Sequence, residues 1–312
     1  MIVGRYAPSP TGALHLGNLR TAVAAWASAR ARGGRFLLRV EDLDVARCKP
    51  EFLERQLADL RLLGIDWDEP ALVQSERTAI YTAHLERLDS FRLVYPCFCS
   101  RREIAESASA PHGATPIYAG TCTHLPRTES MARIANGAQH CWRMRVEAAP
   151  TLFFDGFAGE CPLDLKADGG DFVVRRADGL FAYQLACALD DALSGVTEVV
   201  RGRDLLDSGA RQAWILDRLG LPVPRYLHIP LFLGPEGGRL SKRIGSEDFS
   251  GFLARGFDAT ALRSYLAWTL GLCAPGERIT MADIVTRWSW RHVPREDFRH
   301  DESVLATFRP EE

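Results

Sequence analysis

Arg5-Tyr-Ala-Pro-Ser-Pro-Thr-Gly-Ala-Leu-His-Leu-Gly-Asn18 joins a short apolar run to a long helical pattern near the start of a chain of 312 residues. The apolar run at residues 2–7 predicts a β-strand, and the Ala-rich run at residues 19–32 predicts a helix that stops at a glycine pair. Gly12 and Gly17 remove side chains where the backbone must pass close to another group. Because the N–H groups and the dipole of a helix N-terminus favour phosphate, the stretch predicts an anion site.

Taken alone, such a turn is equally consistent with a purely structural connection. The complete string, however, resembles the first signature of class I aminoacyl-tRNA synthetases, in the form used by the glutamyl-tRNA synthetase group. The resemblance implies that His15 and Gly17 bind ATP, with His15 also catalytic. It further implies an amino-acid pocket that begins with Arg5, Ala7 and Ser9. Asn18 stands where many class I enzymes carry a histidine, and we assign it no catalytic role.

The composition is that of an ordinary globular protein, with 46% apolar and 25% charged residues, which predicts one or two domains. A net charge of −2 predicts no global basic field, so RNA contacts would use local pairs such as Arg101-Arg102 or Arg175-Arg176, unless these are only solvated surface. No apolar run approaches the roughly 20 residues of a membrane helix, and no cleavable signal is recognisable. We expect a cytoplasmic monomer that has no membrane contact.

A second apolar run, residues 36–40, predicts a buried strand that delivers Glu41-Asp-Leu-Asp44 at its carboxyl end. Ligands of open α/β sheets bind outside such ends, so these carboxylates are candidates for function. Asp42 or Asp44 could instead cap the following turn. The string again resembles the glutamyl synthetase group, which implies that Glu41 binds the α-amino group of the substrate.

Eight cysteines in a chain of this length predict reduced thiols or metal ligands and not a disulfide scaffold. Cys97, Cys99 and Cys122 have plausible spacing for a structural zinc site, whose fourth ligand could be Tyr118, His112 or His124; three buried thiols are the alternative. Cys-x-Cys followed by Tyr-x-x-x-Cys resembles the insertion of glutamyl-queuosine tRNA(Asp) synthetases. The resemblance implies one structural Zn²⁺ bound by Cys97, Cys99, Tyr118 and Cys122. Cys141 and Cys161 show no partner pattern.

The second half of the chain contributes Tyr183 on a helical pattern and Arg201 after a strand at residues 196–200. An isolated tyrosine or arginine in such places is usually structural. Their flanking strings resemble the same family, which implies that both bind glutamate. Arg201 would hold the side-chain carboxylate by a bidentate pair that a neutral amide cannot reproduce. Asp190 and Asp191 are candidates for facing the ATP or acceptor site.

Arg239-Leu-Ser-Lys-Arg243 follows a glycine-rich turn and resembles the second class I signature, with arginine at its first and last positions. A mobile loop with a cation suits the charge that develops on leaving pyrophosphate. The resemblance implies that Lys242 binds ATP and is catalytic.

We therefore expect an α/β fold, a Rossmann-like class I synthetase catalytic domain. Its predicted parts are a first half at 1–95, a zinc-bearing insertion at 96–170, a second half at 171–245 and a helical C-terminal segment at 246–312. The resemblance implies ATP-dependent and Mg²⁺-dependent activation of L-glutamate to glutamyl-adenylate, then transfer to queuosine at the wobble position of tRNA(Asp). A minimal glutamyl-tRNA synthetase charging the tRNA 3′ end is the alternative. An ordinary enzyme of that kind would need further domains to read an anticodon, whereas only residues 246–312 follow the second signature. A small-molecule nucleotidyltransferase or a non-catalytic RNA-binding relative would not need all these residues.

Overall fold

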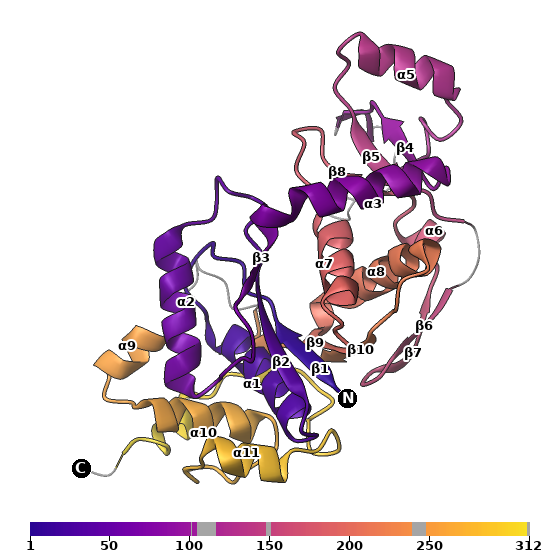
Figure 1. Ribbon diagram of the computed structural model, residues 1–312. Helices are drawn as coiled ribbons and strands as arrows, with labels where there is room; N and C mark the ends of the chain where they lie inside the picture. The colour runs from indigo at the N-terminus through magenta and orange to yellow at the C-terminus, as the bar shows by residue number, and fades with distance from the viewer. Residues whose placement is uncertain (101, 105–116, 148–150, 239–247, 311–312) are drawn as a thin grey trace.

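The computed structural model describes residues 1–100, 102–104, 117–147, 151–238 and 248–310. Its centre is a set of parallel strands (Figure 1). They are β1 (Val3–Tyr6), β2 (Arg35–Val40) and β3 (Leu72–Val73), in that order, and β9 (Glu198–Gly202) beside β10 (Arg225–Ile229). Hydrogen bonds between Val3 and Thr197, which immediately precedes β9, bring β1 next to β9. The parallel arrangement confirms the predicted Rossmann-like class.

Helix α1 (Leu16–Arg30) returns the chain from β1 to β2 and lies between the sheet and the C-terminal helices. It begins three residues earlier than the predicted start at Leu19, because His15 caps it. Helix α2 (Pro50–Leu63) has the predicted bounds. Its proline lies at the first turn and Gly64 closes it at φ 94°, a left-handed conformation that favours glycine.

The second half of the sheet is covered by helices that share a core with it. These are α3 (Thr78–Ser90), which follows a 3₁₀ turn at Gln74–Arg77, α7 (Tyr183–Leu193) and α8 (Leu206–Leu219). Tyr81, Leu185 and Leu216 are buried in this core.

The insertion places its antiparallel sheet at the end of the molecule far from the C-terminal helices, whereas its hairpin packs beside the central strands (Figure 1). Its antiparallel sheet has the order β4 (Val94–Cys97), β5 (Cys141–Met144) and β8 (Phe172–Arg175). A hairpin of β6 (Thr151–Asp155) and β7 (Gly159–Leu163) follows β5 along the chain. Two short helices flank these strands in sequence: α5 (Arg127–Ala135) precedes β5, and α6 (Leu165–Asp168) follows β7.

The C-terminal segment packs on the same core as α1, where Leu262 and Leu266 meet Leu19 and Val23 in one buried cluster. Its helices are α9 (Phe249–Ala254), α10 (Ala259–Thr269), α11 (Met281–Arg287) and α12 (Glu302–Ala306). The segment also supplies β12 (Phe298–Arg299), which pairs with β11 (Phe232–Leu233). A segment that was expected to be helical therefore also contains a strand. None of the helices in the described parts of the chain has the length and apolar character needed to cross a bilayer.

Candidate active site

A cleft of about 650 Å³ opens at the carboxyl ends of β1, β2 and β9, where an open α/β sheet places its ligands. The described residues that the sequence assigned to ATP and glutamate all line it. They are Arg5, Ala7, Ser9, His15, Gly17, Glu41, Tyr183 and Arg201. Lys242, the remaining predicted residue, lies outside the described residues. The fold thus gathers residues that are far apart in sequence around one volume.

The first signature forms a reciprocal cap on α1. The Asn18 N–H donates to Nδ1 of His15 at 3.3 Å, and the His15 N–H donates to the Asn18 side-chain oxygen at 3.3 Å. Because Nδ1 accepts, the proton of a neutral His15 ring is on Nε2, the nitrogen that can donate to a phosphate. A Cβ at Gly17 would lie 3.1 Å from Cε1 of His15, so glycine lets the ring rest against the helix. Asn18, which had been assigned no catalytic role, has this capping role.

Gln56 of α2 holds the signature loop in place. Its buried amide nitrogen donates to the carbonyl oxygens of Ser9 at 3.1 Å and Gly12 at 2.6 Å. Both bonds fix backbone that has no regular secondary structure of its own. The sequence offered no signal for this role, because one glutamine on an amphipathic helix is ordinary.

Arg5 and Arg39 share one buried carboxylate behind the cleft. Asp191 is fully buried and accepts from Nε of Arg5 at 3.1 Å and from Nη1 of Arg39 at 2.5 Å. Burial opposes the charge of Asp191, but the two guanidinium groups outweigh it and lower the pKa of the carboxyl. Burial likewise opposes the charge of Arg5, yet the attraction of Asp191 raises its pKa overall. The network therefore holds two cations against one anion.

Glu41 is oriented by the same network. Its Oε1 accepts from Nη2 of Arg39 at 3.0 Å and from the Cys187 thiol at 3.0 Å. None of the described residues donates to Oε2, so this oxygen is the one that can accept from a ligand ammonium group. Neither Arg39 nor Cys187 was singled out from the sequence, because their roles depend on a contact between β2 and α7.

Arg201 lies at the end of β9 and is buried. Its Nη1 donates to the Tyr183 hydroxyl at 3.2 Å and to the Gln212 side-chain oxygen at 2.9 Å. Among the described residues no carboxylate forms an ion pair with this guanidinium, whereas Arg5 and Arg39 are both paired. A buried cation without a partner anion is costly, so the site favours a ligand that brings a carboxylate.

The other acidic candidates have structural partners. Asp190 is fully buried and accepts from the Tyr81 hydroxyl, Gln74 and Arg77. Neither Asp190 nor Asp191 lines the cleft, so the expectation that they face ATP or the acceptor is wrong. Asp42 accepts from the N–H and the hydroxyl of Ser75, as a turn cap does.

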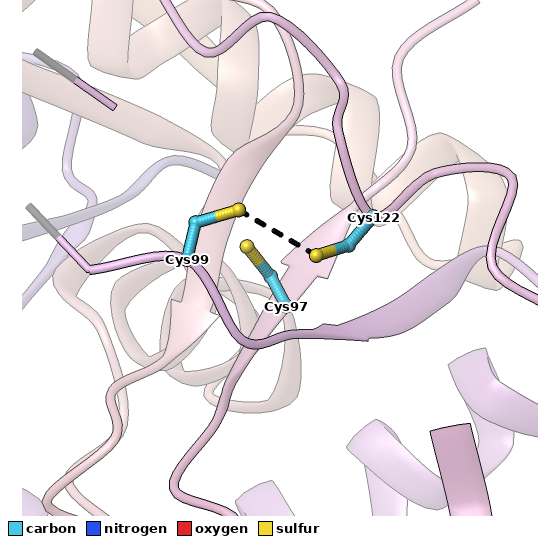
Figure 2. Close-up of side chains that lie close together, drawn as sticks. All are labelled: Cys97, Cys99 and Cys122. Atoms are coloured by element: carbon cyan, nitrogen blue, oxygen red, sulfur yellow. Dashed lines mark hydrogen bonds between the residues drawn. The ribbon is translucent and has the colours of Figure 1, made fainter. Parts of the chain in front are cut away.

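Three cysteines of the insertion point toward one another (Figure 2). The sulfurs of Cys97, Cys99 and Cys122 lie within 4.8 Å of one another, and the Cys99 and Cys122 sulfurs are 3.6 Å apart. The Tyr118 hydroxyl is 3.3 Å from the Cys97 sulfur and 3.9 Å from that of Cys99. Ligand atoms of a tetrahedral zinc lie about 3.5–3.8 Å apart, given Zn–S near 2.3 Å and Zn–O near 2.0 Å. The four side chains therefore fit such an ion. His124 lies outside this sulfur cluster, and His112 outside the described residues.

Cys141, for which the sequence showed no partner, lies opposite Cys97 in the β4–β5 pair. A hydrogen bond from Cys141 lowers the pKa of the Cys97 thiol to about 4 against the opposing effect of burial, with further bonds from Tyr118 and Arg143. Thiolate is the form that binds metal. Burial raises the pKa of Tyr118 well above its ordinary value, so its phenol is protonated when no metal is bound.

Comparison with known proteins agrees with this geometry. Residues 1–290 match the family model of the catalytic domain of class I tRNA synthetases, E and Q. The glutamyl-Q tRNA(Asp) synthetase of Symbiobacterium thermophilum is 45% identical over 98% of both chains, and that of Nocardia farcinica is 48% identical over 90% of this chain and 88% of the relative. A crystal structure of a glutamate tRNA ligase from Elizabethkingia meningosepticum, in complex with its amino acid, is similar with a TM-score of 0.87 and 25% identity; the match covers 98% of this chain and 68% of that one.

Fold, cleft and relatives thus agree. The chain belongs to the class I tRNA synthetases of the E and Q group and, within that group, to the family of the glutamyl-Q tRNA(Asp) synthetases.

Proposed function

We propose that this protein activates L-glutamate with ATP and transfers the glutamyl group to queuosine at the wobble position of tRNA(Asp). The observation that carries the proposal is the charge arrangement of the cleft. In and behind the cleft, Arg5, Arg39 and Arg201 exceed Asp191 and Glu41 by one positive charge, while the charges of Arg47 and Asp204, which also line it, cancel each other. Glutamate carries one net negative charge. A dicarboxylic amino acid supplies the anion that Arg201 lacks.

The amino acid is oriented by groups at the carboxyl ends of β1, β2 and β9 and by Tyr183 of α7. Arg201 and Tyr183 bind its side-chain carboxylate, and Oε2 of Glu41 accepts from its ammonium group. Arg5, Ala7 and Ser9 complete the pocket. Glutamine is excluded because its amide brings no charge to Arg201 and directs N–H groups toward a cation.

Activation needs positioning and charge stabilisation and no protein nucleophile. A carboxylate oxygen of glutamate attacks the α-phosphorus of ATP, the bond to the bridging oxygen breaks, and pyrophosphate leaves. His15 donates to a phosphate oxygen from Nε2, and Lys242 supplies a positive charge that stabilises the charge developing on the leaving pyrophosphate. Mg²⁺, when bound, neutralises charge on the phosphates. A hydroxyl of the acceptor then attacks the glutamyl carbonyl carbon, an ester forms, AMP leaves, and the hydroxyl proton passes to solvent.

Cys97, Cys99, Tyr118 and Cys122 would hold one zinc ion. With four protein ligands such an ion has no open position, so its role is to hold β4 and the following loop together and not to act on substrate.

The acceptor follows from the family. Relatives that match nearly end to end are glutamyl-Q tRNA(Asp) synthetases. The diol of queuosine resembles a terminal ribose in presenting two vicinal hydroxyls, so the adenylate chemistry need not change. Its tRNA substrate and ATP are both cytoplasmic, which is where we place the reaction.

The test is transfer of radiolabelled glutamate to four purified tRNAs. Queuosine-containing tRNA(Asp) should be labelled, and the same tRNA without the modification should not. Queuosine-containing tRNA(Asp) trimmed of its 3′-terminal adenosine is the matched control, and it should still accept the label. Labelling of unmodified tRNA(Glu) at its terminal adenosine, with no labelling of the trimmed tRNA, would show a minimal glutamyl-tRNA synthetase instead.

A further inference from the structure

Arg201 contacts His228, a residue that has no role in the function proposed above. In the parallel pairing of β9 with β10, Arg201 and His228 occupy the same register position, so both side chains leave the sheet on the same side. Nε of Arg201 donates to Nε2 of His228 at 2.9 Å, and both residues are buried. The imidazole thus fixes one edge of the guanidinium, while Tyr183 and Gln212 contact another part of it.

This bond determines the tautomer of His228. An arginine Nε–H can only donate, so Nε2 of His228 must be the acceptor and the ring proton must be on Nδ1. Nδ1 lies 2.7 Å from Oδ2 of Asp155, which is fully buried. Burial and the nearby Arg201 charge lower the pKa of His228 despite the carboxylate, in keeping with a neutral ring.

Asp155 is a strong and well-held acceptor. Its Oδ1 accepts from the N–H groups of Phe157 at 2.9 Å and Ala158 at 2.7 Å, and both of its oxygens lie within bonding distance of the His228 N–H. Burial opposes ionisation, but the bonds from His228 and these N–H groups lower the pKa of Asp155 overall. The carboxylate ends strand β6, and the hairpin lies beside β10 (Figure 1), so the insertion contacts the residue that pairs with Arg201.

The helix that covers this chain of contacts leaves space for it. Gly209 lies within α8, where glycine costs about 1 kcal/mol relative to alanine. A Cβ there would lie 2.9 Å from Cε1 of His228 and 3.3 Å from Nη2 of Arg201. The glycine therefore permits close approach of the helix to both side chains.

We propose that Asp155 and His228 are positioning residues for glutamate recognition: Asp155 keeps the proton of His228 on Nδ1, so that Nε2 accepts from Arg201 and aims its guanidinium at the substrate carboxylate. The inference rests on the proposed use of glutamate. It assigns to the β6–β7 hairpin a part in substrate selection that is separate from the metal cluster.

Asp155→Asn is the direct test, because it changes the hydrogen-bonding pattern with almost no change of shape. The asparagine oxygen can still accept from Phe157 and Ala158, but its NH₂ then faces Nδ1 and favours the tautomer with the proton on Nε2, opposite the Arg201 N–H. The KM for glutamate in ATP–pyrophosphate exchange should rise about 10- to 100-fold, as expected for loss of a charged hydrogen bond. The KM for ATP should change less than about threefold.

A second substitution separates positioning from general damage. The side-chain oxygen of glutamine can take the place of Nε2, so His228→Gln should keep the KM for glutamate within a few fold of wild type, whereas His228→Phe should raise it as much as Asp155→Asn. The double variant Asp155→Asn, His228→Gln should have a KM for glutamate no lower than that of Asp155→Asn alone, because an amide that turns its oxygen toward Arg201 would turn its NH₂ toward the NH₂ of the new asparagine. A purely structural role predicts instead that His228→Gln raises the KM for glutamate as much as His228→Phe does.

Asp171→Asn is a matched control, because Asp171 is an equally buried carboxylate that accepts from Tyr95 and Lys166 in the insertion. The Asp171→Asn variant should have the same KM for glutamate as the wild-type protein. A wild-type KM in Asp155→Asn, in a variant whose thermal midpoint shows it to be folded, would overturn the positioning role. Wild-type protein without any glutamate-dependent exchange would instead overturn the proposed function, so the two failures are distinguishable.

Discussion

Asp191→Asn should destabilise the protein far more than an ordinary loss of one ion pair. The carboxylate is fully buried and is the shared anion of Arg5 and Arg39. Removing one partner of a buried pair costs about 3–5 kcal/mol, because the remaining charge is left without compensation. Glu41 stays 3.0 Å from Arg39, so the cost falls mainly on Arg5 and we expect the lower end, about 3 kcal/mol.

The assay is urea unfolding followed by tryptophan fluorescence, with Glu129→Gln as the control. Glu129 pairs with Arg133 one helical turn away, and both side chains are 46% exposed, so the same carboxylate-to-amide change should cost less than about 0.5 kcal/mol. A loss below about 1 kcal/mol for Asp191→Asn would refute the reasoning, because the two arginines would then not depend on this anion.

The same network predicts a pH dependence. Burial raises the pKa of Asp191, but Arg39 and Arg5 more than offset this and the folded-state pKa is lowered. Its stabilisation is therefore complete above the unfolded-state pKa of about 3.9 and is lost as the pH falls through the lower folded-state value. The difference in unfolding free energy between wild type and Asp191→Asn should be constant from neutral pH to about pH 5 and shrink below pH 4.

Three further outcomes are expected. Lys242→Ala should slow glutamate-dependent ATP–pyrophosphate exchange by about 10²–10³-fold, as for loss of one preorganised charge-stabilising donor, and an unchanged rate would contradict its role. Metal analysis should find one zinc per chain in wild type and in Cys141→Ser but none in a variant with both Cys97 and Cys99 changed to Ser; zinc that survives the double change would exclude the cluster. Gly17→Ala should raise the KM for ATP about tenfold, because the new Cβ would lie 3.1 Å from the His15 ring and overpacking costs about 1–3 kcal/mol; an unaltered KM would show that the ring can move freely.

Local sequence preferences predicted the bounds of an element correctly where those bounds depend only on the element's own residues. Helix α2 has the predicted bounds because Pro50 and Gly64 determine its ends through their own backbone preferences. For α1 the same rules placed the start too late, because the cap formed by His15 and Asn18 requires both side chains to turn back on the helix. Strand β12 was missed, since its two residues form a strand only by pairing with β11.

The sequence by itself determined which chemical groups are present and, through motif strings, which of them meet at the carboxyl ends of the strands: Arg5, His15, Glu41, Tyr183 and Arg201. The resemblance of those strings to a known family supplied this grouping, and local propensity only placed each group beside a strand end or a helix start. Only the tertiary structure decided what stands behind these groups. Asp191 between two arginines, Asp155 behind His228, and Cys141 opposite Cys97 are contacts between segments far apart in the chain. Such contacts are selected by strand register and by the need to pair every buried charge, and neither condition leaves a periodic mark on the sequence.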